Sequence, residues 1–400
     1  MLYKIVRDRI EQNKNLRESG GYVGIPVPFT RLQDYLPSLE QGHSIGILGG
    51  TGTGKSRFAR YFSIYAPYKF YKDTGYKLKI FYLPLEDSKE KVYMNLICHY
   101  LNDIYGYKVS LQELQSKGSR ILPQIIMDAI YEAEDFFSEF EDIVTILDGY
   151  SDPKSIYTVL ESYLLDPEVG YVDEYEVDVK GRKEKQTRYV PLQHVILLLD
   201  NYSNIDLDDS HETERAAVQE MAKKYVRGYL CNFYKVTAIQ VLQTDFATER
   251  AQYGSDGKAI MSKVEPNLAS IGDVKTISRS MHIIMSLFDP SKFDFLTYPQ
   301  VSQKQLKEDP EAIKKVYNID VLGNKFRALK VLKNNDGDTG VRIGLYFDAI
   351  TENFTELPSP ESSEMQRWYD QFKKKGLDTP VKTNRTLETY NEGLFDEDPF

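Results

Sequence analysis

The sequence GGTGTGKS occupies residues 49–56 and has the Gly-x-x-x-x-Gly-Lys-Ser spacing of a nucleotide phosphate-binding loop. Its glycines allow successive backbone N–H groups to curl around phosphate oxygens without a clash from a Cβ atom. The apolar segment SIGILG (44–49) precedes the loop as a predicted strand, and KSRFARYFSIYA (55–66) follows it as a predicted helix. The positive end of that helix would face the bound anion. These features predict a nucleotide-binding α/β protein.

The loop also suggests roles for single residues. Lys55 is expected to neutralise the β- and γ-phosphates, and the Ser56 hydroxyl is expected to ligate Mg²⁺. The implied ligands are therefore ATP and Mg²⁺. The residues predicted to bind nucleotide are Gly49, Gly50, Thr51, Gly52, Thr53, Gly54, Lys55, Ser56 and Arg57.

Beyond the loop, apolar strands alternate with helical segments. The predicted strands lie at 77–86, 143–148, 194–200, 235–243 and 280–288, with a hairpin at 326–348. The predicted helices lie at 88–103, 121–140, 153–165 and 213–231. This alternation favours a mostly parallel sheet covered by helices on both faces.

Three parts are predicted along the chain. A short amphipathic helix (1–20) precedes a core at 21–355. Residues 356–400 are rich in Pro, Ser, Lys and Glu, and we expect them to form a flexible tail. Within the core, the charged residues 166–190 alternate on both sides of KGRK, which fits an exposed inserted hairpin, with an irregular loop as the alternative.

Composition excludes several classes of protein. The net charge of −10 argues against a simple nucleic-acid coat, which needs a basic face. No stretch reaches the roughly 18–20 apolar residues of a membrane helix, and the N-terminus is too charged for a secretory signal. Cys98 and Cys231 lie far apart without metal-ligand spacing, which is typical of a reducing compartment. We therefore expect a cytoplasmic protein that does not bind membranes.

A second acid should help to hold the metal, at the end of an apolar strand. Asp148 follows IVTIL and Asp200 follows HVILLL. Asp200 ends the more apolar strand, whereas Asp148 precedes GYSDPKS, which resembles a helix entry capped by Ser151 or Asp152. The pattern favours Asp200 as the second metal ligand beside Ser56.

Hydrolysis also needs a carboxylate that orients or deprotonates water. Glu86 follows the strand KIFYLPL and would emerge at the same edge of the sheet as the phosphate loop, although it could instead serve as an acid at a helix N-terminus. Gln243 ends KVTAIQVLQ at that edge. It could sense the γ-phosphate or be a solvent-exposed strand end.

Together these segments resemble the DnaB-type replicative helicases, whose motor is a RecA-like ATPase. The resemblance runs in order over residues 1–355. It rests on GIPVPFTRLQDYLPSLEQGHSIGILGGTGTGKS (24–56), IFYLPLEDSKEKVYMNLI (80–97), ILDGYSDPKSIYTVL (146–160), VILLLDNYSNI (195–205), VLQTD (241–245) and KVLKNNDGDTGVRIGLYF (330–347). This resemblance implies an α/β fold with a RecA-like P-loop core and a C-terminal β-hairpin. We expect this chain to lack the family's N-terminal primase-contacting domain, and the helix at 1–20 resembles the family's linker helix.

The resemblance implies a role for each site residue. Lys55, Ser56 and Asp200 would bind MgATP, Glu86 would activate water, and Gln243 would couple the γ-phosphate to DNA loops. Such motors are hexameric rings that hold ATP between subunits and single-stranded DNA in a central channel. In the family, a lysine and an arginine finger from the hairpin of the next subunit complete the site, and Lys333 matches that lysine.

Two departures from the family pattern matter. The arginine position falls on Asn335, so Lys333 acts alone, Arg327 or Arg342 substitutes, or hydrolysis is slow. The family's Arg-Glu-Ser-Gly run is replaced by SIGDVKTISRSMH (270–282), where Lys275 and Arg279 could contact DNA phosphates or be ordinary loop charges.

The chain ends LFDEDPF, an acidic tip with a terminal aromatic residue. This resembles the tips of single-strand-binding proteins and of some phage-type helicases. We expect Asp396, Glu397, Asp398 and Phe400 to dock a replication protein, with a solubilising tail as the alternative. The sequence thus predicts an ATP-hydrolysing DNA helicase of phage type, located in the host cytoplasm if phage-encoded. The alternatives are a RecA-like DNA-binding ATPase that does not unwind DNA, and a nucleotide-binding virion or assembly scaffold.

Overall fold

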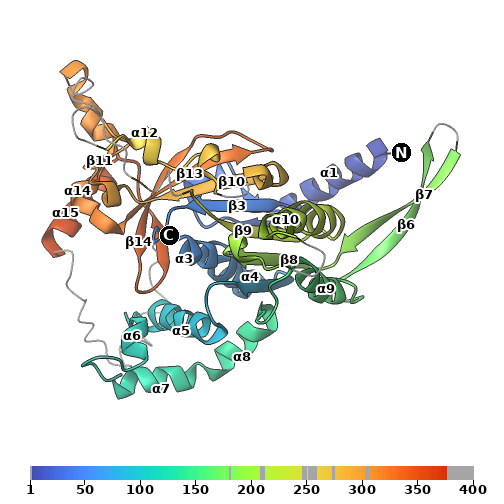
Figure 1. Cartoon of the computed structure of the whole chain (residues 1–400), viewed down its shortest axis with the longest axis horizontal. Helices are drawn as coiled ribbons and strands as arrows, with labels where there is room; N and C mark the ends of the chain where they lie inside the picture. Colours follow the sequence, from blue (N-terminus) through green and yellow to red (C-terminus); the bar gives the residue numbers. More distant parts are fainter. Residues whose placement is uncertain are drawn as a thin grey trace.

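A computed structural model describes residues 2–179, 182–207, 212–245, 250, 259–272, 275–301 and 307–375. Within these residues the central sheet has nine strands in the order β15-β14-β13-β10-β3-β9-β8-β4-β5 (Figure 1). Their bounds are β3 (Ser44–Gly49), β4 (Leu78–Pro84), β5 (Val144–Ile146), β8 (His194–Asp200), β9 (Thr237–Gln243), β10 (Ile283–Phe288), β13 (Phe326–Asn334), β14 (Arg342–Asp348) and β15 (Asn353–Glu356).

Six neighbouring strands of this sheet, from β10 to β5, run parallel, and β13, β14 and β15 add an antiparallel edge. Every residue of β3 and of β8 is buried, as their continuous apolar sequences predict for central parallel strands. The carboxyl ends of the parallel strands meet at one edge of the sheet, and the phosphate loop begins there, directly after β3.

Helices cover both faces of the sheet, and each face has its own apolar core. The larger helical segments are α3 (Lys55–Arg60) continued by η1 (Tyr61–Tyr65) and α4 (Ala66–Thr74), α5 (Lys89–Tyr105), α7 (Gln124–Glu132), α8 (Glu134–Ile143), α9 (Pro153–Leu164), and α10 (Glu214–Glu220) continued by η3 (Met221–Phe233). The short elements include β1 (Ile25–Pro26), α2 (Thr30–Gln33), β2 (Ser38–Leu39), α6 (Leu111–Leu114), α12 (Met261–Val264), β11 (Thr297–Tyr298), β12 (Tyr317–Asn318) and α14 (Ile319–Leu322). The predicted α/β fold with a mostly parallel sheet is confirmed.

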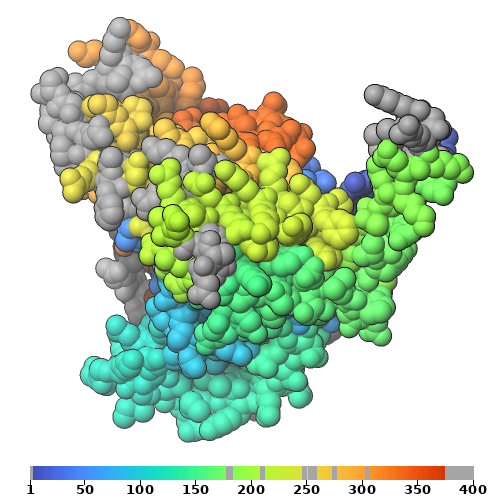
Figure 2. All heavy atoms as spheres, turned by 45° about the vertical axis from the view of Figure 1, so that its right-hand side comes forward, coloured from blue at the N-terminus to red at the C-terminus, as the bar shows by residue number. Residues whose placement is uncertain are grey.

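Two elements project from this body. Helix α1 (Leu2–Glu18) extends away from the sheet and leaves Tyr3, Val6 and Ile10 exposed (Figure 1). Strands β6 (Gly170–Val179) and β7 (Arg182–Pro191) form a long antiparallel ribbon that stands out from the surface (Figure 2). Cross-strand pairs such as Arg188 with Asp173 follow from the alternating charges of its sequence. Strands β6 and β7 are thus paired as the two arms of a hairpin are, in the stretch for which the sequence left a hairpin and an irregular loop open.

The C-terminal part differs from the sequence expectation. Residues Ser363–Lys375 form helix α15, in which Met365 is fully buried while Trp368 and Phe372 pack against Tyr346 of β14. The spacing of Trp368 and Phe372 places both rings on one face of the helix, and this short apolar stripe anchors it to the sheet edge. The prediction of a flexible tail from residue 356 is therefore wrong as far as Lys375. Residues 376–400, with the acidic tip, lie outside the described residues.

Among the described helices, none combines the length and the apolar character needed to cross a membrane.

Candidate functional site

The phosphate loop has a backbone that only glycine accommodates well. Gly52 and Gly54 have φ angles of 66° and 93°, in the left-handed region. A Cβ atom on Gly54 would also lie 3.1 Å from the Phe347 ring, and one on Gly49 would lie 2.8 Å from the carbonyl oxygen of Leu287. The sequence motif is thus required both by the turn and by the close approach of β10 and β14.

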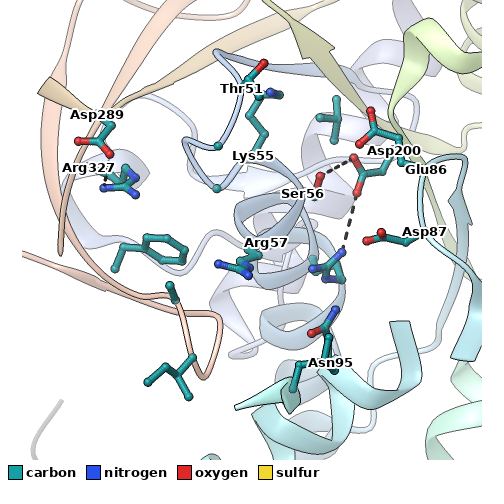
Figure 3. A pocket seen from close by; sticks show the side chains of 18 of the residues that line it. Thr51, Lys55, Ser56, Arg57, Glu86, Asp87, Asn95, Asp200, Asp289 and Arg327 are labelled. Atoms are coloured by element: carbon teal, nitrogen blue, oxygen red, sulfur yellow. Dashed lines mark hydrogen bonds and ion pairs between the residues drawn. The ribbon is translucent and has the colours of Figure 1, made fainter. Parts of the chain in front are cut away.

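The loop opens onto a cavity of about 1100 Å³ (Figure 3). This volume is large enough for a nucleotide, since ligand sites commonly span roughly 300–1000 Å³. The sequence-predicted residues that line it are Thr51, Gly52, Gly54, Lys55, Ser56, Arg57, Glu86, Asp200 and Gln243. Lys55 lies over the loop, where its Nζ donates to the carbonyl oxygen of Gly50 at 3.0 Å.

Ser56 and Asp200 meet at the floor of this cavity. The Ser56 hydroxyl donates to Asp200 Oδ1 at 2.9 Å, and Asp200 is only 4% exposed (Figure 3). Burial raises the pKa of the Asp200 carboxyl above its usual value, against the opposing influence of the Arg60 charge. A carboxylate and a hydroxyl oxygen are hard ligands of the kind that Mg²⁺ prefers, so the pair fits this ion.

Protein groups alone would not complete a metal site here. Within the described residues no cluster of three His, Cys, Asp or Glu side chains could hold a metal. Mg²⁺ usually keeps several waters and binds through one or two protein ligands together with substrate phosphates. The Ser56–Asp200 pair therefore fits a metal that arrives with a nucleotide.

Glu86 is connected to the loop through a chain of amides. Asn201 Nδ2 donates to Glu86 Oε1 at 2.9 Å and lies 3.3 Å from Gln243 Oε1. Gln243 Nε2 in turn donates to Thr51 Oγ1 at 3.1 Å. Strand β4 ends at Pro84, so Glu86 lies just beyond it and is exposed to the cavity rather than being the last strand residue. The structure thus brings Glu86, Asp200 and Gln243 together.

No motif in the sequence marks Asn201 as a site residue. The only signal for it was its position directly after the strand that carries Asp200, where a side chain reaches the same edge of the sheet. It is 3% exposed, and its amide joins three of the parallel strands, because Glu86, Asn201 and Gln243 follow or end β4, β8 and β9.

Arg327 supports the loop from within its own chain. It is buried, its Nε donates to the Thr53 carbonyl oxygen at 2.6 Å, and its Nη1 lies 3.1 Å from Asp289 Oδ2. Burial lowers its pKa, while Asp289 counteracts this shift. Arg342 is paired with Glu265 at 3.3 Å. Both arginines that could have replaced an arginine finger are therefore engaged inside one chain.

Lys333 and Asn335 lie far from this cavity along the sheet. Lys333 pairs in register with Ile284, near the beginning of β10, whereas the phosphate loop follows the end of β3. The Lys333 Nζ donates to the carbonyl oxygen of Ser278 at 3.0 Å. The backbone N–H of Asn335 donates to the carbonyl oxygen of His282 at 3.0 Å. Within one chain, these residues do not join the nucleotide site.

The remaining predicted residues lie elsewhere. Arg279, in the short helix η5 (Lys275–Ser280), is exposed, and its carbonyl oxygen accepts from Arg227. The side chain of Lys275 and the acidic tip fall outside the described residues. Asp148 is exposed, and Asp152 caps helix α9 by accepting from the N–H groups of Lys154 and Ser155.

Solved structures of DnaB-like helicases share this fold. The ATPase domain of a DnaB-like helicase matches with a TM-score of 0.56 and 13% identity, over 88% of this chain and 99% of that chain. A DnaB-like replicative helicase, described with its interactions with primase, matches with a TM-score of 0.53 and 15% identity, over 88% of this chain and 66% of that one. A KaiC-like protein from the hyperthermophilic archaeon Pyrococcus horikoshii OT3 matches with a TM-score of 0.42 and 14% identity, over 84% and 97% of the two chains.

No protein-family model matches the chain, and no curated protein matches its sequence. At such low identities the structural likeness establishes the fold alone. The chain has the RecA-like fold found in the ATPase domains of DnaB-like helicases, which confirms the fold inferred from the motifs.

Proposed function

We propose that this chain is a DnaB-like motor that hydrolyses MgATP and moves along single-stranded DNA during replication. The observation that carries the proposal is the meeting of Ser56, Asp200 and Glu86 around the phosphate loop. A phosphate cradle alone would support binding. The additional carboxylate of Glu86, exposed to the cavity and held by Asn201, supports hydrolysis because it can orient an attacking water.

Each residue around the cavity would have a separate role in ATP hydrolysis. Lys55 and the loop N–H groups bind the phosphates, and Ser56 with Asp200 would hold Mg²⁺, which neutralises charge on the transferred phosphoryl group. Gln243 contacts both Thr51 of the loop and Asn201 beside Glu86. A movement of the loop on binding or loss of the γ-phosphate would therefore displace the Gln243 side chain at the end of β9.

The assembly is part of the proposal. Lys333 lies away from its own cavity, which suits a residue that acts on the site of a neighbouring subunit in a hexameric ring. The exposed apolar residues of α1 suit packing onto another subunit. Arg279 and Lys275 would face single-stranded DNA, and the tip residues Asp396–Phe400 would dock a replication protein in the cytoplasm.

A second function is favoured by one observation. Asn335 stands where an arginine finger is expected, and Arg327 and Arg342 are already engaged. An arginine finger is worth about 10³–10⁵ in rate. A DNA-binding ATPase that does not unwind is therefore the alternative. A purely structural nucleotide-binding scaffold is disfavoured, because it would need no water-orienting acid at Glu86.

The decisive experiment measures ATP hydrolysis with and without single-stranded DNA, together with strand separation, for the wild type and Lys55→Ala. Hydrolysis stimulated by single-stranded DNA and accompanied by strand separation supports the helicase. Stimulated hydrolysis without separation supports the alternative. ATP binding without turnover would refute both and leave the scaffold.

A further inference from the structure

A chain of buried polar side chains extends from the Asp200 carboxylate, beside the cavity that Arg60 also lines. Asp200 Oδ2 accepts a hydrogen bond from the Tyr82 hydroxyl at 3.1 Å, while Oδ1 is used by Ser56. The Tyr82 oxygen in turn lies 3.1 Å from Arg60 Nη1, and Arg60 is held by Glu352 through two hydrogen bonds of 2.9 and 2.5 Å.

The donors and acceptors in this chain have only one possible order. A guanidinium group has no acceptor, so Arg60 must donate to the Tyr82 oxygen. The single hydroxyl proton of Tyr82 is then directed to Asp200 Oδ2. This arrangement fixes the rotation of the Asp200 carboxylate and turns its other oxygen, Oδ1, toward Ser56.

The cluster is buried far more deeply than an ordinary ion pair. Tyr82, Arg60 and Glu352 are 0%, 2% and 2% exposed. Burial by itself raises the pKa of Glu352, but the charge and hydrogen bonds of Arg60 outweigh it and lower the pKa below its usual value. The pair is thus ionised, and removing one partner would leave the other buried charge with only a longer contact, that of Glu352 to Arg57 at 3.5 Å or that of Arg60 to Asp200 at 4.0 Å.

Glu352 adopts an unusual backbone conformation. It lies in the turn between β14 and β15 with φ of 57°, a left-handed conformation that a non-glycine residue adopts at an energetic cost. Its side chain accepts from Arg60 and from the Tyr65 hydroxyl at 3.1 Å. The strain is offset by these contacts, so the carboxylate rather than the turn accounts for the residue at this position.

We propose that Glu352, Arg60 and Tyr82 act as positioning residues that hold the Asp200 carboxylate in the orientation that binds the divalent cation of MgATP. This inference rests on the proposed function, since it assumes that Ser56 and Asp200 receive the cation. Groups behind the direct ligands of a metal fix the geometry of those ligands, and their removal typically costs about 10–100-fold in metal affinity or activity.

The test uses Mn²⁺, a paramagnetic stand-in for Mg²⁺, and a non-hydrolysable ATP analogue. Electron paramagnetic resonance reports free Mn²⁺, which gives its affinity for the protein–analogue complex. The variants are Tyr82→Phe and Glu352→Gln. Tyr82→Phe keeps the ring and removes only the hydroxyl, so it tests the proposal even if loss of the buried charge in Glu352→Gln prevents folding.

Tyr298→Phe is a matched control. Tyr298 is 1% exposed, and its hydroxyl donates to Glu265 at 2.6 Å, so the substitution removes an equivalent buried bond to a carboxylate away from Asp200. We expect Tyr82→Phe to weaken Mn²⁺ binding by about tenfold or more, with metal-free binding of the analogue unchanged and Tyr298→Phe like the wild type. The Mg²⁺ concentration needed for half-maximal ATP hydrolysis should rise in parallel.

Two results would overturn the inference in distinguishable ways. Equal Mn²⁺ affinity for the wild type, Tyr82→Phe and Tyr298→Phe would refute the positioning role while leaving the ATP site intact. A wild type that binds the analogue but never recruits Mn²⁺ would refute the proposed MgATP site itself, and this inference with it.

Discussion

The two ends of the parallel sheet differ sharply in what they carry. At the carboxyl end, Ser56, Glu86 and Asp200 converge on one cavity within a single chain. At the amino end, Lys333 and Asn335 donate hydrogen bonds to nearby backbone carbonyl groups of the same chain. One chain thus brings the proposed phosphate- and metal-binding residues together, whereas Lys333 and Asn335 lie too far along the sheet to join them within the same chain.

The largest effect is expected for the carboxyl end. Replacing Glu86 by Gln keeps the size of the side chain but removes its basicity, so ATP turnover should fall by about 10²–10⁴-fold while ATP binding persists. Steady-state hydrolysis and binding of a fluorescent ATP analogue measure the two effects. Glu90→Gln, an exposed glutamate on the first turn of α5, should leave turnover unchanged. A Glu86→Gln protein with wild-type turnover would remove the water-activating role.

The next effect tests the amino end. Lys333→Met should lower turnover by about 10²–10³-fold, because it removes a cation that stabilises developing charge, with ATP affinity nearly unchanged. Lys330→Met, on the same strand but paired with Glu265, is the control.

A mixing experiment tells whether Lys333 acts between subunits. A mixture of Lys55→Ala and Lys333→Met proteins pairs an intact loop on one subunit with an intact lysine on the next. Hydrolysis in the mixture above that of either variant alone is the expected result. Strict additivity of the two low activities would place Lys333 outside the site.

A smaller gain is expected from Asn335→Arg. Asn335 is exposed, so an arginine fits there without repacking. If this position faces the nucleotide of the next subunit, turnover should rise by about tenfold, less than the 10³–10⁵ of a native finger because its surroundings are not adapted to it. Asp338→Arg, an exposed position in the same turn, controls for added charge. A rate equal to that of the control would show that the turn does not reach the site.

The smallest effect concerns stability at the amino end. Burial lowers the pKa of His194, at the start of β8, to about 3, with a further contribution from His43. The Thr237 hydroxyl donates to the Glu40 carbonyl oxygen, so it accepts from His194 Nε2, and the ring is neutral when folded. The unfolded chain therefore binds a proton below about pH 6.5 that the folded chain excludes.

Stability should consequently fall as the pH drops from about 6.5 toward 3, by at most about 1.4 kcal/mol per pH unit from this residue. The free energy of unfolding in urea, measured at pH values of about 7.5, 6.5 and 5.5 for the wild type and His194→Gln, tests this effect. The pH values are about one unit apart, so each step can be compared directly with the slope per pH unit. The free energy of unfolding of His194→Gln should fall less steeply with decreasing pH than that of the wild type. Equal slopes would mean that His194 is not excluded from protonation.

Residue patterns along the chain were enough to predict the parallel core, the phosphate loop and the candidate residues at the strand ends. Continuous apolar strands and a glycine-rich loop are local patterns, and the carboxyl ends of parallel strands must meet at one edge. Glu86, Asp200 and Gln243 could therefore be predicted to gather before any contact was known.

The remaining features depend on contacts between residues that are far apart in sequence. Asn201 bridges Glu86 and Gln243, Arg327 supports Thr53, and Glu352 holds Arg60, which stands 292 positions away in sequence. Helix α15 was likewise missed, because its short apolar stripe becomes meaningful only against Tyr346. A buried charge or amide needs a partner, and the partner is selected by the packing of strands and turns that are distant in sequence.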